Sequence, residues 1–447
     1  MNRKLAHTQF AITVVLWLTL AAISGNANAT DTPTVDAQIT QLLDQRYAHL
    51  DALYKDLHQH PELGFQETRS AARLATEMRA LGFEVTEGVG RTGLVALYRN
   101  GPGPMVLVRT DLDALPMAEK TGLPYASQAT ARWNGERVPV MHACGHDIHM
   151  ASWVGTASAL IALKTQWRGS LMFIAQPSEE TISGAKAMIA DGLFQRFGKP
   201  DYGFGLHVGS MPSGRLIYRA GTFTSSSDSV ELVFHGKGGH GSMPATAIDP
   251  ILIASRFVDD VQSLVSRETD PAKFGVVTLG AFHAGSAANI IPDQARLRGT
   301  VRSFEPEVRE KLLSGIRRIA LAEAQMAAAP APDIRMDVES AGPVVNDAAL
   351  TARTVEAWQP VFGDQLVQSP QPFSGSEDYS VFIEAGVPSL FFFVNGYEPT
   401  IVNEALRAGT PMPVNHSPLF APVPEPTIRT GVRAMTLAVM NVLPVTR

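Results

Sequence analysis

Cysteine is nearly absent from this chain: Cys144 is the only one in 447 residues. A single cysteine cannot form an intramolecular disulfide, so it serves packing, metal binding or nucleophilic chemistry. The chain also has no excess of basic residues, and its formal net charge of −6 argues against a nucleic-acid-binding protein. Low-complexity tracts and short repeats are missing as well. The length and the hydrophobic content predict one large globular domain or two ordinary ones.

A hydrophobic run long enough to cross a membrane is also missing. The apolar stretch Phe10–Ile23 is short, and it lies between a basic start and the small residues Ala27 and Ala29, a pattern typical of a signal-peptidase site. We therefore predict that residues 1–29 are a cleaved export signal and that the mature protein is periplasmic or secreted. An uncleaved membrane anchor is the alternative. A free thiol is a liability in an oxidising compartment, which favours a metal-bound Cys144 over an inert buried one.

The first half of the chain has the pattern of an α/β fold, in which short apolar runs predict buried strands. Groups that can bind metal or move protons follow three of these predicted strands. The strands and the groups that follow them are Met105–Arg109 with Asp111 and Asp113, Ser170–Ala175 with Glu179 and Glu180, and Tyr202–Leu206 with His207. Ligands of open α/β sheets lie beyond the carboxyl ends of the strands, so we expect these side chains to meet.

The middle of the chain has a different pattern, which predicts the order strand, helix, strand, strand, helix, strand, and the last of these strands is Ile334–Val338. Within it, Asp293–Arg302 alternates strictly between apolar and polar residues, as a strand with one buried face does. This βαββαβ order is typical of the ferredoxin-like arrangement, in which two helices cover one face of a sheet. The α/β pattern returns after Gly342. We predict a discontinuous α/β domain with a mixed sheet flanked by helices (residues 30–221 and 342–447) and a smaller lid or dimerisation domain inserted into it (residues 222–341).

Cys144 lies in a segment that is dense in metal-binding side chains, Met141–Asp147. The segments that could join it are Glu179–Glu180, His207 and Asn415–Pro418, which contains His416. One thiolate, several imidazoles and several carboxylates suit a borderline divalent ion such as zinc, and two ions about 4 Å apart could share a bridging water. One of the two adjacent glutamates could bind metal while the other takes a proton. A solvated acidic pair is the alternative.

Several motifs together resemble a known family. They are His58-Gln59-His60-Pro61-Glu62-Leu63-Gly64-Phe65, Asp111-Leu112-Asp113-Ala114-Leu115-Pro116, His142-Ala143-Cys144-Gly145-His146-Asp147, Gly238-Gly239-His240-Gly241-Ser242-Met243-Pro244, Ser376-Glu377-Asp378 and Asn415-His416-Ser417-Pro418. In this order they are similar to the aminoacylase and carboxypeptidase-G-like metal-dependent amidohydrolases. Within that family they resemble the branch of hippurate hydrolases, bacterial N-acyl-amino-acid amidohydrolases and plant auxin-conjugate hydrolases. The resemblance covers nearly the whole chain after residue 29.

The resemblance implies two divalent metal ions. The thiolate favours zinc, with manganese or cobalt as alternatives. The implied ligands are His146 and Glu180 for one ion, His207 and His416 for the other, and Cys144 as the bridge between them. Glu179 matches the general base of the family. Asp111 stands where other branches have a metal-binding histidine, and this departure argues against Asp111 as a ligand. Asp113 is expected to orient a ligand instead.

Three residues of the inserted domain are also implicated. The resemblance implies that His240 reaches the active site of a second subunit and stabilises the oxyanion, so we expect a homodimer, and it implies a substrate contact for Asn289. Arg302 could bind the carboxylate of the substrate, although an ordinary strand arginine is an equal alternative. Gly236–Gly241 fits the G-x-G-x-x-G pattern of dinucleotide sites. We reject that interpretation because the predicted helix, Ala247–Ser266, begins too late.

These residues predict a hydrolase that cleaves the amide bond of N-acyl amino acids or related small conjugates into a carboxylate and a free amino acid. In this hypothesis a hydroxide that bridges the metal ions attacks the carbonyl carbon, and Glu179 accepts its proton and returns one to the leaving amine. One metal and His240 stabilise the oxyanion. Three alternatives stay open: an exopeptidase that acts on dipeptides, a catalytically inactive periplasmic binding protein for small conjugates, and a hydrolase that uses Cys144 as its nucleophile.

Overall fold

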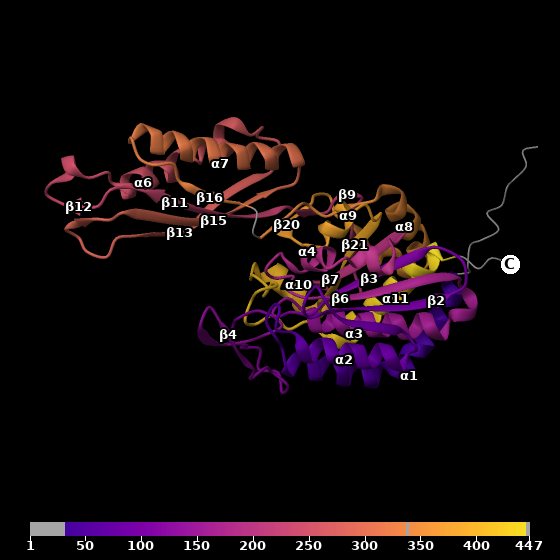
Figure 1. Ribbon diagram of the computed structural model, residues 1–447. Helices are drawn as coiled ribbons and strands as arrows, with labels where there is room; N and C mark the ends of the chain where they lie inside the picture. Colours follow the sequence, from indigo (N-terminus) through magenta and orange to yellow (C-terminus); the bar gives the residue numbers. More distant parts are fainter. Residues whose placement is uncertain (1–31, 337–338, 444–447) are drawn as a thin grey trace, which may run out of the picture.

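A mixed sheet of eight strands, flanked by helices, forms the centre of the larger part of the molecule (Figure 1). The structure is a computed structural model that describes residues 32–336 and 339–443. Across the sheet the strands lie in the order β1 (Glu84–Val89), β2 (Gly93–Asn100), β6 (Gly169–Gln176), β3 (Met105–Asp111), β7 (Tyr202–Pro212), β21 (Ser389–Tyr397), β8 (Leu216–Tyr218) and β19 (Leu366–Gln368). Strands β6, β3, β7 and β21 are parallel to one another, whereas β2 pairs with β6 in the antiparallel sense. The predicted α/β fold with a mixed sheet is confirmed.

Helices cover both faces of this sheet because its inner strands are apolar on both sides. In β6, Phe173 and Ala175 pack into one core, and Met172 and Ile174 pack into the other. The helices of the first face are α1 (Thr32–Gln59), α2 (Thr68–Ala80), α3 (His146–Ala162), α8 (Ala348–Phe362) and α11 (Pro424–Val442). Those of the second face are α4 (Gly184–Ala190), α5 (Leu193–Phe197) and α9 (Ser380–Glu384). Because the faces are buried, the strand ends are left for a ligand.

Two predicted elements differ from the structure. The predicted strand Tyr202–Leu206 is too short: β7 continues to Pro212 because its parallel partner β21 pairs with it over the same length, so His207 lies within the strand and not beyond its end. The predicted helix Ala247–Ser266 is too long. Helix α6 (Pro250–Asp260) begins after Asp249, whose side chain accepts a hydrogen bond from the backbone N–H of Ile251, and a separate π-helical turn follows it.

Outside the two sheets of the molecule and the helices that cover them, the remaining strands and one further helix are short. They are the hairpin of β4 (Thr130–Trp133) and β5 (Glu136–Pro139), the pairs β9 (Gly221–Thr222) with β18 (Val345–Asn346), β10 (Thr224–Ser225) with β20 (Phe373–Ser376) and β12 (Gly239–His240) with β14 (Ile290–Ile291), and helix α10 (Pro399–Ala408). The predicted export signal, residues 1–29, lies outside the described residues. Within the described residues, no helix is long and apolar enough to cross a membrane.

A second, antiparallel sheet projects to one side of the first (Figure 1). Its strands lie in the order β13 (Gly275–Ala284), β15 (Gln294–Ser303), β11 (Ser227–His235) and β16 (Asp333–Arg335), and β17 (Ser340–Ala341) also pairs with β11. Helices α6 and α7 (Pro306–Met326) cover one face, where Phe234, Phe257 and Leu297 are buried. The end of the predicted strand Ile334–Val338 lies outside the described residues. The domain boundaries at 221 and 341, and a role as lid or dimerisation unit, stay predictions.

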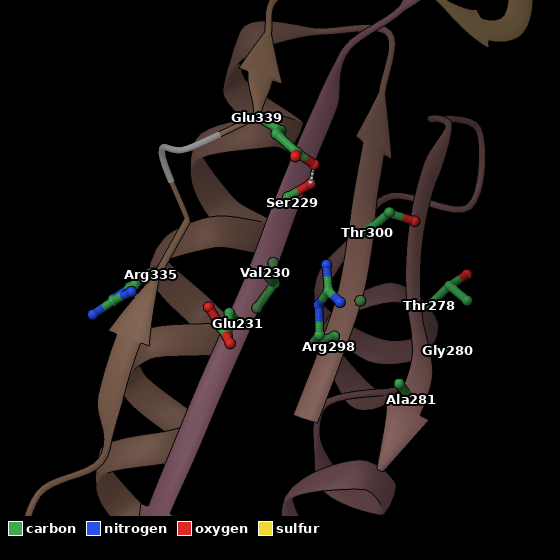
Figure 2. A pocket seen from close by; sticks show the side chains of 11 residues that line it. Ser229, Val230, Glu231, Thr278, Gly280, Ala281, Arg298, Thr300, Arg335 and Glu339 are labelled. Atoms are coloured by element: carbon green, nitrogen blue, oxygen red, sulfur yellow. Dashed lines mark hydrogen bonds between the residues drawn. The ribbon is translucent and has the colours of Figure 1, made fainter. Parts of the chain in front are cut away.

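The face of the second sheet that lies away from the helices is polar and open (Figure 2). A cavity of about 470 Å³ lies on it, lined among others by Arg298, Thr300 and Arg335. Arg302 lies further along β15, toward the large sheet, where it is half-buried and donates a hydrogen bond to the hydroxyl of Ser376. Strand β15 therefore carries one arginine of its open face to the boundary between the two sheets.

Candidate active site

Most of the predicted site residues meet in one cavity of about 550 Å³ at the junction of the two sheets. The predicted residues that line it are Cys144, Glu179, Glu180, His207, His416 and Arg302. Part of its wall is aromatic and consists of Phe373, Phe391 and Phe393. The cavity thus combines metal-binding groups, one guanidinium and an apolar surface.

Cys144 stands between two sets of potential metal ligands. Its Sγ lies 3.3 Å from Nε2 of His207. The ligand atoms of Cys144, His146 and His207 lie within 4.8 Å of one another, and so do those of Cys144, Glu180 and His416. In the second set, Nε2 of His416 lies 3.2 Å from a carboxylate oxygen of Glu180. Cys144 belongs to both sets. The resemblance paired His146 with Glu180 and His207 with His416, whereas these sets join His146 to His207 and Glu180 to His416. The division of ligands between two ions therefore stays a prediction.

The two buried histidines of this cluster have the orientation that a metal ligand needs. Nδ1 of His146 lies 2.7 Å from the carbonyl oxygen of Asp113, and Nδ1 of His207 lies 2.9 Å from that of Val208. In a neutral imidazole, a ring nitrogen that donates its proton to a carbonyl leaves the other nitrogen, here Nε2, with a free lone pair. Nε2 of His146 and Oε1 of Glu180 are buried, and neither has a hydrogen-bond partner within the described ranges. A cation is the partner that satisfies both, so the residues present fit a metal site.

Burial makes this cluster costly in the absence of a cation. Burial raises the pKa of the Cys144 thiol well above its usual value, and the carboxylates of Glu180 and Glu179 add to the shift. Burial lowers the pKa of His207 well below its usual value, which keeps that imidazole neutral. Metal binding deprotonates a thiol and requires a neutral imidazole. A neutral His207 is therefore ready to bind a metal ion, while Cys144 needs the ion in order to ionise.

Backbone geometry places the ligands on both sides of the cavity. Gly145 precedes helix α3 with φ of +85°, and a Cβ at this position would meet Cγ1 of Val208 at 2.2 Å, so the turn between Cys144 and His146 requires glycine. The side-chain amide of Asn415 donates to the carbonyl oxygens of Cys144 and Val208, each at 3.1 Å. These bonds fasten the segment that carries His416 to the two segments that carry the other ligands.

The adjacent glutamates have different surroundings. A carboxylate oxygen of Glu180 lies 3.2 Å from Nε2 of His416, while each of the two glutamates has an oxygen 3.9 Å from Nε2 of His146. Glu179 lines the cavity, and its carboxyl group accepts no hydrogen bond from any residue that the structure describes. Burial, followed by the neighbouring carboxylates of Glu377 and Glu180, raises the pKa of Glu179 well above its usual value. A carboxyl group with a raised pKa and no hydrogen bond that fixes it can accept a proton and return it.

The two aspartates that follow β3 also differ in their partners. Asp113 accepts the backbone N–H groups of Glu179 and Glu180, one at each carboxylate oxygen and each at 3.0 Å. Asp111 has both oxygens occupied, by Nη1 of Arg109 at 2.6 Å and by Nδ1 of His149 at 2.8 Å. Asp113 therefore fixes the backbone of the glutamate pair, whereas each oxygen of Asp111 already accepts a hydrogen bond from a side chain.

Comparison with known proteins assigns the chain to a family. The model of peptidase family M20/M25/M40 matches residues 107–410. This chain belongs to that family. Hippurate hydrolase of Campylobacter jejuni is 38% identical over 353 residues, 77% of this chain and 88% of that protein. N-acetylcysteine deacetylase of Bacillus subtilis is 34% identical over 361 residues, 79% and 90% of the two chains. The crystal structure of YXEP protein of Bacillus subtilis, described as a dinuclear metal binding peptidase from the M20 family, matches with a TM-score of 0.70 at 28% identity over 91% of this chain and 99% of that one.

The family assignment confirms the placement that the motifs predicted, and with it a metal-dependent hydrolase. The alternative of a catalytically inactive binding protein loses its support. The identity of the metal and the roles of single residues stay predictions.

Sequence reasoning missed a buried network behind the M20 site. Nη2 of Arg109 lies 2.7 Å from Oε1 of Glu377, while Nε of Arg109 donates to Oε1 of Gln176 at 3.0 Å. Gln176 in turn donates to Asp378 at 2.6 Å. Removing the charge on one side of such a buried pair typically costs about 3–5 kcal/mol of stability. The network thus ties the ends of β3 and β6 to the Ser376–Asp378 segment that closes the cavity.

His149 is a second residue that sequence reasoning missed. Its Nε2 accepts the backbone N–H of Val208 at 2.8 Å, so its Nδ1 carries the proton that is donated to Asp111. The signal for it was present: His149 follows His146 by three residues, which places both on one face of helix α3. His149 links α3 to the backbone next to His207.

Two predicted residues lie far from this cavity within the chain. His240 and Asn289 are exposed on the small β12–β14 ribbon, where the backbone N–H of Gly241 donates to the carbonyl of Asn289 at 2.8 Å. Figure 1 shows β12 at the end of the second sheet that is remote from the large sheet. A single chain of this M20 protein therefore brings Arg302 to the site, but neither His240 nor Asn289. Their roles stay predictions.

Proposed function

We propose that this protein hydrolyses the amide bond of N-acyl amino acids or related small conjugates, which yields a carboxylate and a free amino acid. The observation that carries this proposal is the cavity lined by a thiol, two imidazoles and three glutamates beside a half-buried arginine, with the buried His146 within 4.8 Å of the thiol. The relatives support it, since a hippurate hydrolase and an N-acetylcysteine deacetylase both act on acylated amino acids. The aromatic part of the wall gives the acyl group an apolar surface.

Five residues would hold two divalent ions: Cys144, His146, Glu180, His207 and His416. Their donor set of one thiolate, three imidazoles and one carboxylate favours zinc, with manganese or cobalt as alternatives. When bound, such ions act as Lewis acids that polarise a carbonyl oxygen and lower the pKa of a water molecule. The chain's own contribution is to fix the orientation of these ligands through the carbonyls of Asp113 and Val208.

Glu179 is the general base in this proposal. It accepts a proton from the attacking water and later returns one to the leaving amine. Its carboxyl group lines the cavity without a hydrogen bond from the described residues, which supports this role, whereas the carboxylate of Glu180 contacts His416. Arg302 binds the carboxylate of the amino acid, because its guanidinium is the cationic side chain in the cavity wall. Substrate is thereby oriented with its carboxylate toward β15.

A panel of substrates tests the proposed function. N-acetyl and N-benzoyl amino acids should be hydrolysed with a kcat/KM at least about tenfold above that for dipeptides, a difference of about 1.4 kcal/mol in transition-state binding. The alternative function, an exopeptidase that acts on dipeptides, predicts a higher kcat/KM for dipeptides than for N-acyl amino acids. If none of these compounds is cleaved by the metal-loaded protein, the proposed function is wrong.

We propose that the protein acts as a homodimer in which His240 of one subunit stabilises the oxyanion in the site of the other, with Asn289 next to the substrate. The remote position of both residues within one chain supports this, since neither is among the described residues that line the cavity. Mixing two inactive variants tests it. Refolded or co-expressed mixtures of Glu179→Gln and His240→Ala should regain roughly a quarter of the wild-type activity, because half the dimers are mixed and each has one intact site.

The mixing experiment has a clear negative outcome. If His240 acted within its own chain, each mixed dimer would hold no intact site and the mixture would stay inactive. Full activity of His240→Ala alone would remove this residue from the mechanism.

The proposal of export rests on residues 1–29 alone. Signal cleavage should leave a mature protein that begins near Thr30 and is released with the periplasmic or extracellular fraction. Sequencing the N-terminus of the protein from each fraction checks this expectation, and an intact Met1 in a membrane fraction would support the anchor instead.

A further inference from the structure

Two buried carboxylates bind three consecutive backbone N–H groups of the loop that carries Glu179. Oε1 of Glu67 accepts the N–H of Ser178 at 2.7 Å. The two oxygens of Asp113 accept the next two N–H groups, those of Glu179 and Glu180. Glu67 lies just before helix α2, more than a hundred residues from this loop in the sequence, and its side chain is fully buried. Side chains from other segments therefore supply the hydrogen-bond acceptors for this loop. In a sheet, a neighbouring strand would supply them.

This loop needs such support because its backbone is strained. Ser178 and Ile182 both have φ of +51°, in the left-handed region that side chains other than glycine rarely adopt. Strained residues persist only where the surrounding contacts determine the conformation, and they gather at functional sites. The strained Ser178 immediately precedes Glu179. Its backbone orientation determines where the chain leaves β6 and hence where the Glu179 carboxyl group points.

The segment before α2 is shaped to deliver Glu67 to this position. At Gly64, a Cβ would lie 2.5 Å from the hydroxyl oxygen of Ser178, so only glycine lets the turn approach the loop. The N-terminal N–H groups of α2 are bound by Glu62, which accepts from Arg69 at 3.0 Å and Ser70 at 2.8 Å. Glu67 makes no capping bond of its own. Its second oxygen accepts the hydroxyl of Thr92 at 2.5 Å, which fixes the rotation of the carboxyl group.

We infer that Glu67 is a positioning residue for the general base: its bond to the Ser178 N–H, oriented by Thr92, holds the loop in the conformation that directs Glu179 into the cavity. This inference rests on the proposed function in so far as Glu179 is the base. It also explains two residues of the motif at His58–Phe65. Glu62 caps helix α2 in place of Glu67, and Gly64 leaves space for the loop at Ser178. Burial and the nearby Asp113 carboxylate raise the pKa of Glu67 to about 7. Burial disfavours the charged form of this carboxyl group, so its role at this position is the hydrogen bond to the Ser178 N–H.

Kinetics of three variants test the inference. Glu67→Ala should lower kcat by roughly 10- to 100-fold, because a shift of about 1 Å in a reacting group has an effect of that size, while KM stays within about twofold since Arg302 is untouched. Glu67→Gln keeps an amide oxygen for the Ser178 N–H and should restore kcat to within about threefold of the wild type.

Glu77→Ala is the matched control: Glu77 lies on the same helix and pairs with Arg73 and His49, so its loss perturbs α2 without reaching the loop. Its kcat should be unchanged.

A fourth variant keeps the inference testable if Glu67→Ala does not fold. Thr92→Val removes the hydroxyl that orients Glu67 and should lower kcat by roughly three- to tenfold, again with little change in KM. Unchanged kcat in both Thr92→Val and any folded Glu67→Ala protein would overturn the inference. So would a Glu67→Gln variant as slow as Glu67→Ala, because the charge and not the hydrogen bond would then matter.

Hydrogen exchange separates this inference from the proposed function. The backbone N–H of Ser178 should exchange at least about tenfold faster in Glu67→Ala than in wild type and Glu67→Gln, whether or not the protein hydrolyses acyl amino acids. Equal exchange in all three proteins would overturn the contact. If the wild type cleaves no acyl amino acid, the proposed function fails while the exchange result still decides on Glu67. If the wild type is active and Glu179→Gln is not, an unchanged kcat in Glu67→Ala overturns only the role of Glu67.

Discussion

Glu179→Gln is expected to lower kcat on N-acyl amino acids by roughly 10²- to 10⁴-fold while the bound metal is retained, the usual contribution of a positioned general base. Glutamine has nearly the same shape but cannot accept the proton, and the Glu179 carboxyl group forms no hydrogen bond within the described residues that the change would disturb. Initial rates with metal content measured on the same samples check this result. KM should change little, since the groups that bind the substrate are intact.

A matched control for this variant is Glu404→Gln. Glu404 is an exposed glutamate of helix α10 that lines none of the cavity. It makes the same chemical change at the surface and should leave kcat unchanged. If Glu179→Gln kept near-native turnover with its metal bound, another group would be the base, and the difference between the two neighbouring glutamates would need a different explanation.

Cys144→Ala is expected to abolish activity and to remove both metal ions together. Cys144 is the residue that the two sets of ligand atoms have in common, one with His146 and His207 and the other with Glu180 and His416. Losing a shared thiolate weakens both sites at once, whereas His416→Ala removes a ligand from one set and should weaken mainly one ion. Elemental analysis after dialysis against metal-free buffer distinguishes the two patterns.

The same measurement decides between a metal-binding and a nucleophilic cysteine. A cysteine that acts as nucleophile predicts that Cys144→Ala loses activity but keeps its metal content unchanged. Burial opposes that alternative, because it raises the pKa of the thiol and so disfavours the thiolate unless a cation is near. Retention of both ions in Cys144→Ala would therefore show that Cys144 does not bridge them.

The sequence predicted the part of the site that short local patterns can encode. Apolar runs located β3 and β6, and since parallel strands end at one edge of a sheet, the carboxylates after them were expected to meet. The motif around Cys144 supplied a thiol and an imidazole on either side of a glycine that the observed turn requires. His207 was placed beyond a strand end because the predicted β7 stopped too early. Its place in the cavity was right for a different reason, the longer pairing of β7 with β21.

The sequence could not predict contacts between residues that are far apart in the chain. Arg109 and Glu377 are separated by 268 positions, and their contact depends on how the Ser376–Asp378 segment returns to β3. Glu67 is separated from Ser178 by 111 positions, and nothing in the local pattern tells its bond to the loop from an ordinary capping bond of α2. Such contacts follow from the packing of the whole fold. The position of His240 on a remote ribbon likewise emerges only from the arrangement of the two sheets.

We propose that bound divalent ions and Glu179 together hydrolyse acylated amino acids. Metal analysis of the purified wild type, coupled to hydrolysis of N-acetyl and N-benzoyl amino acids before chelation, after chelation and after the ions are returned, tests it most directly. We predict about two divalent ions per chain, loss of hydrolysis on their removal and recovery when they are restored. Full hydrolysis by the chelated, metal-free protein would show that the reaction does not need bound divalent ions.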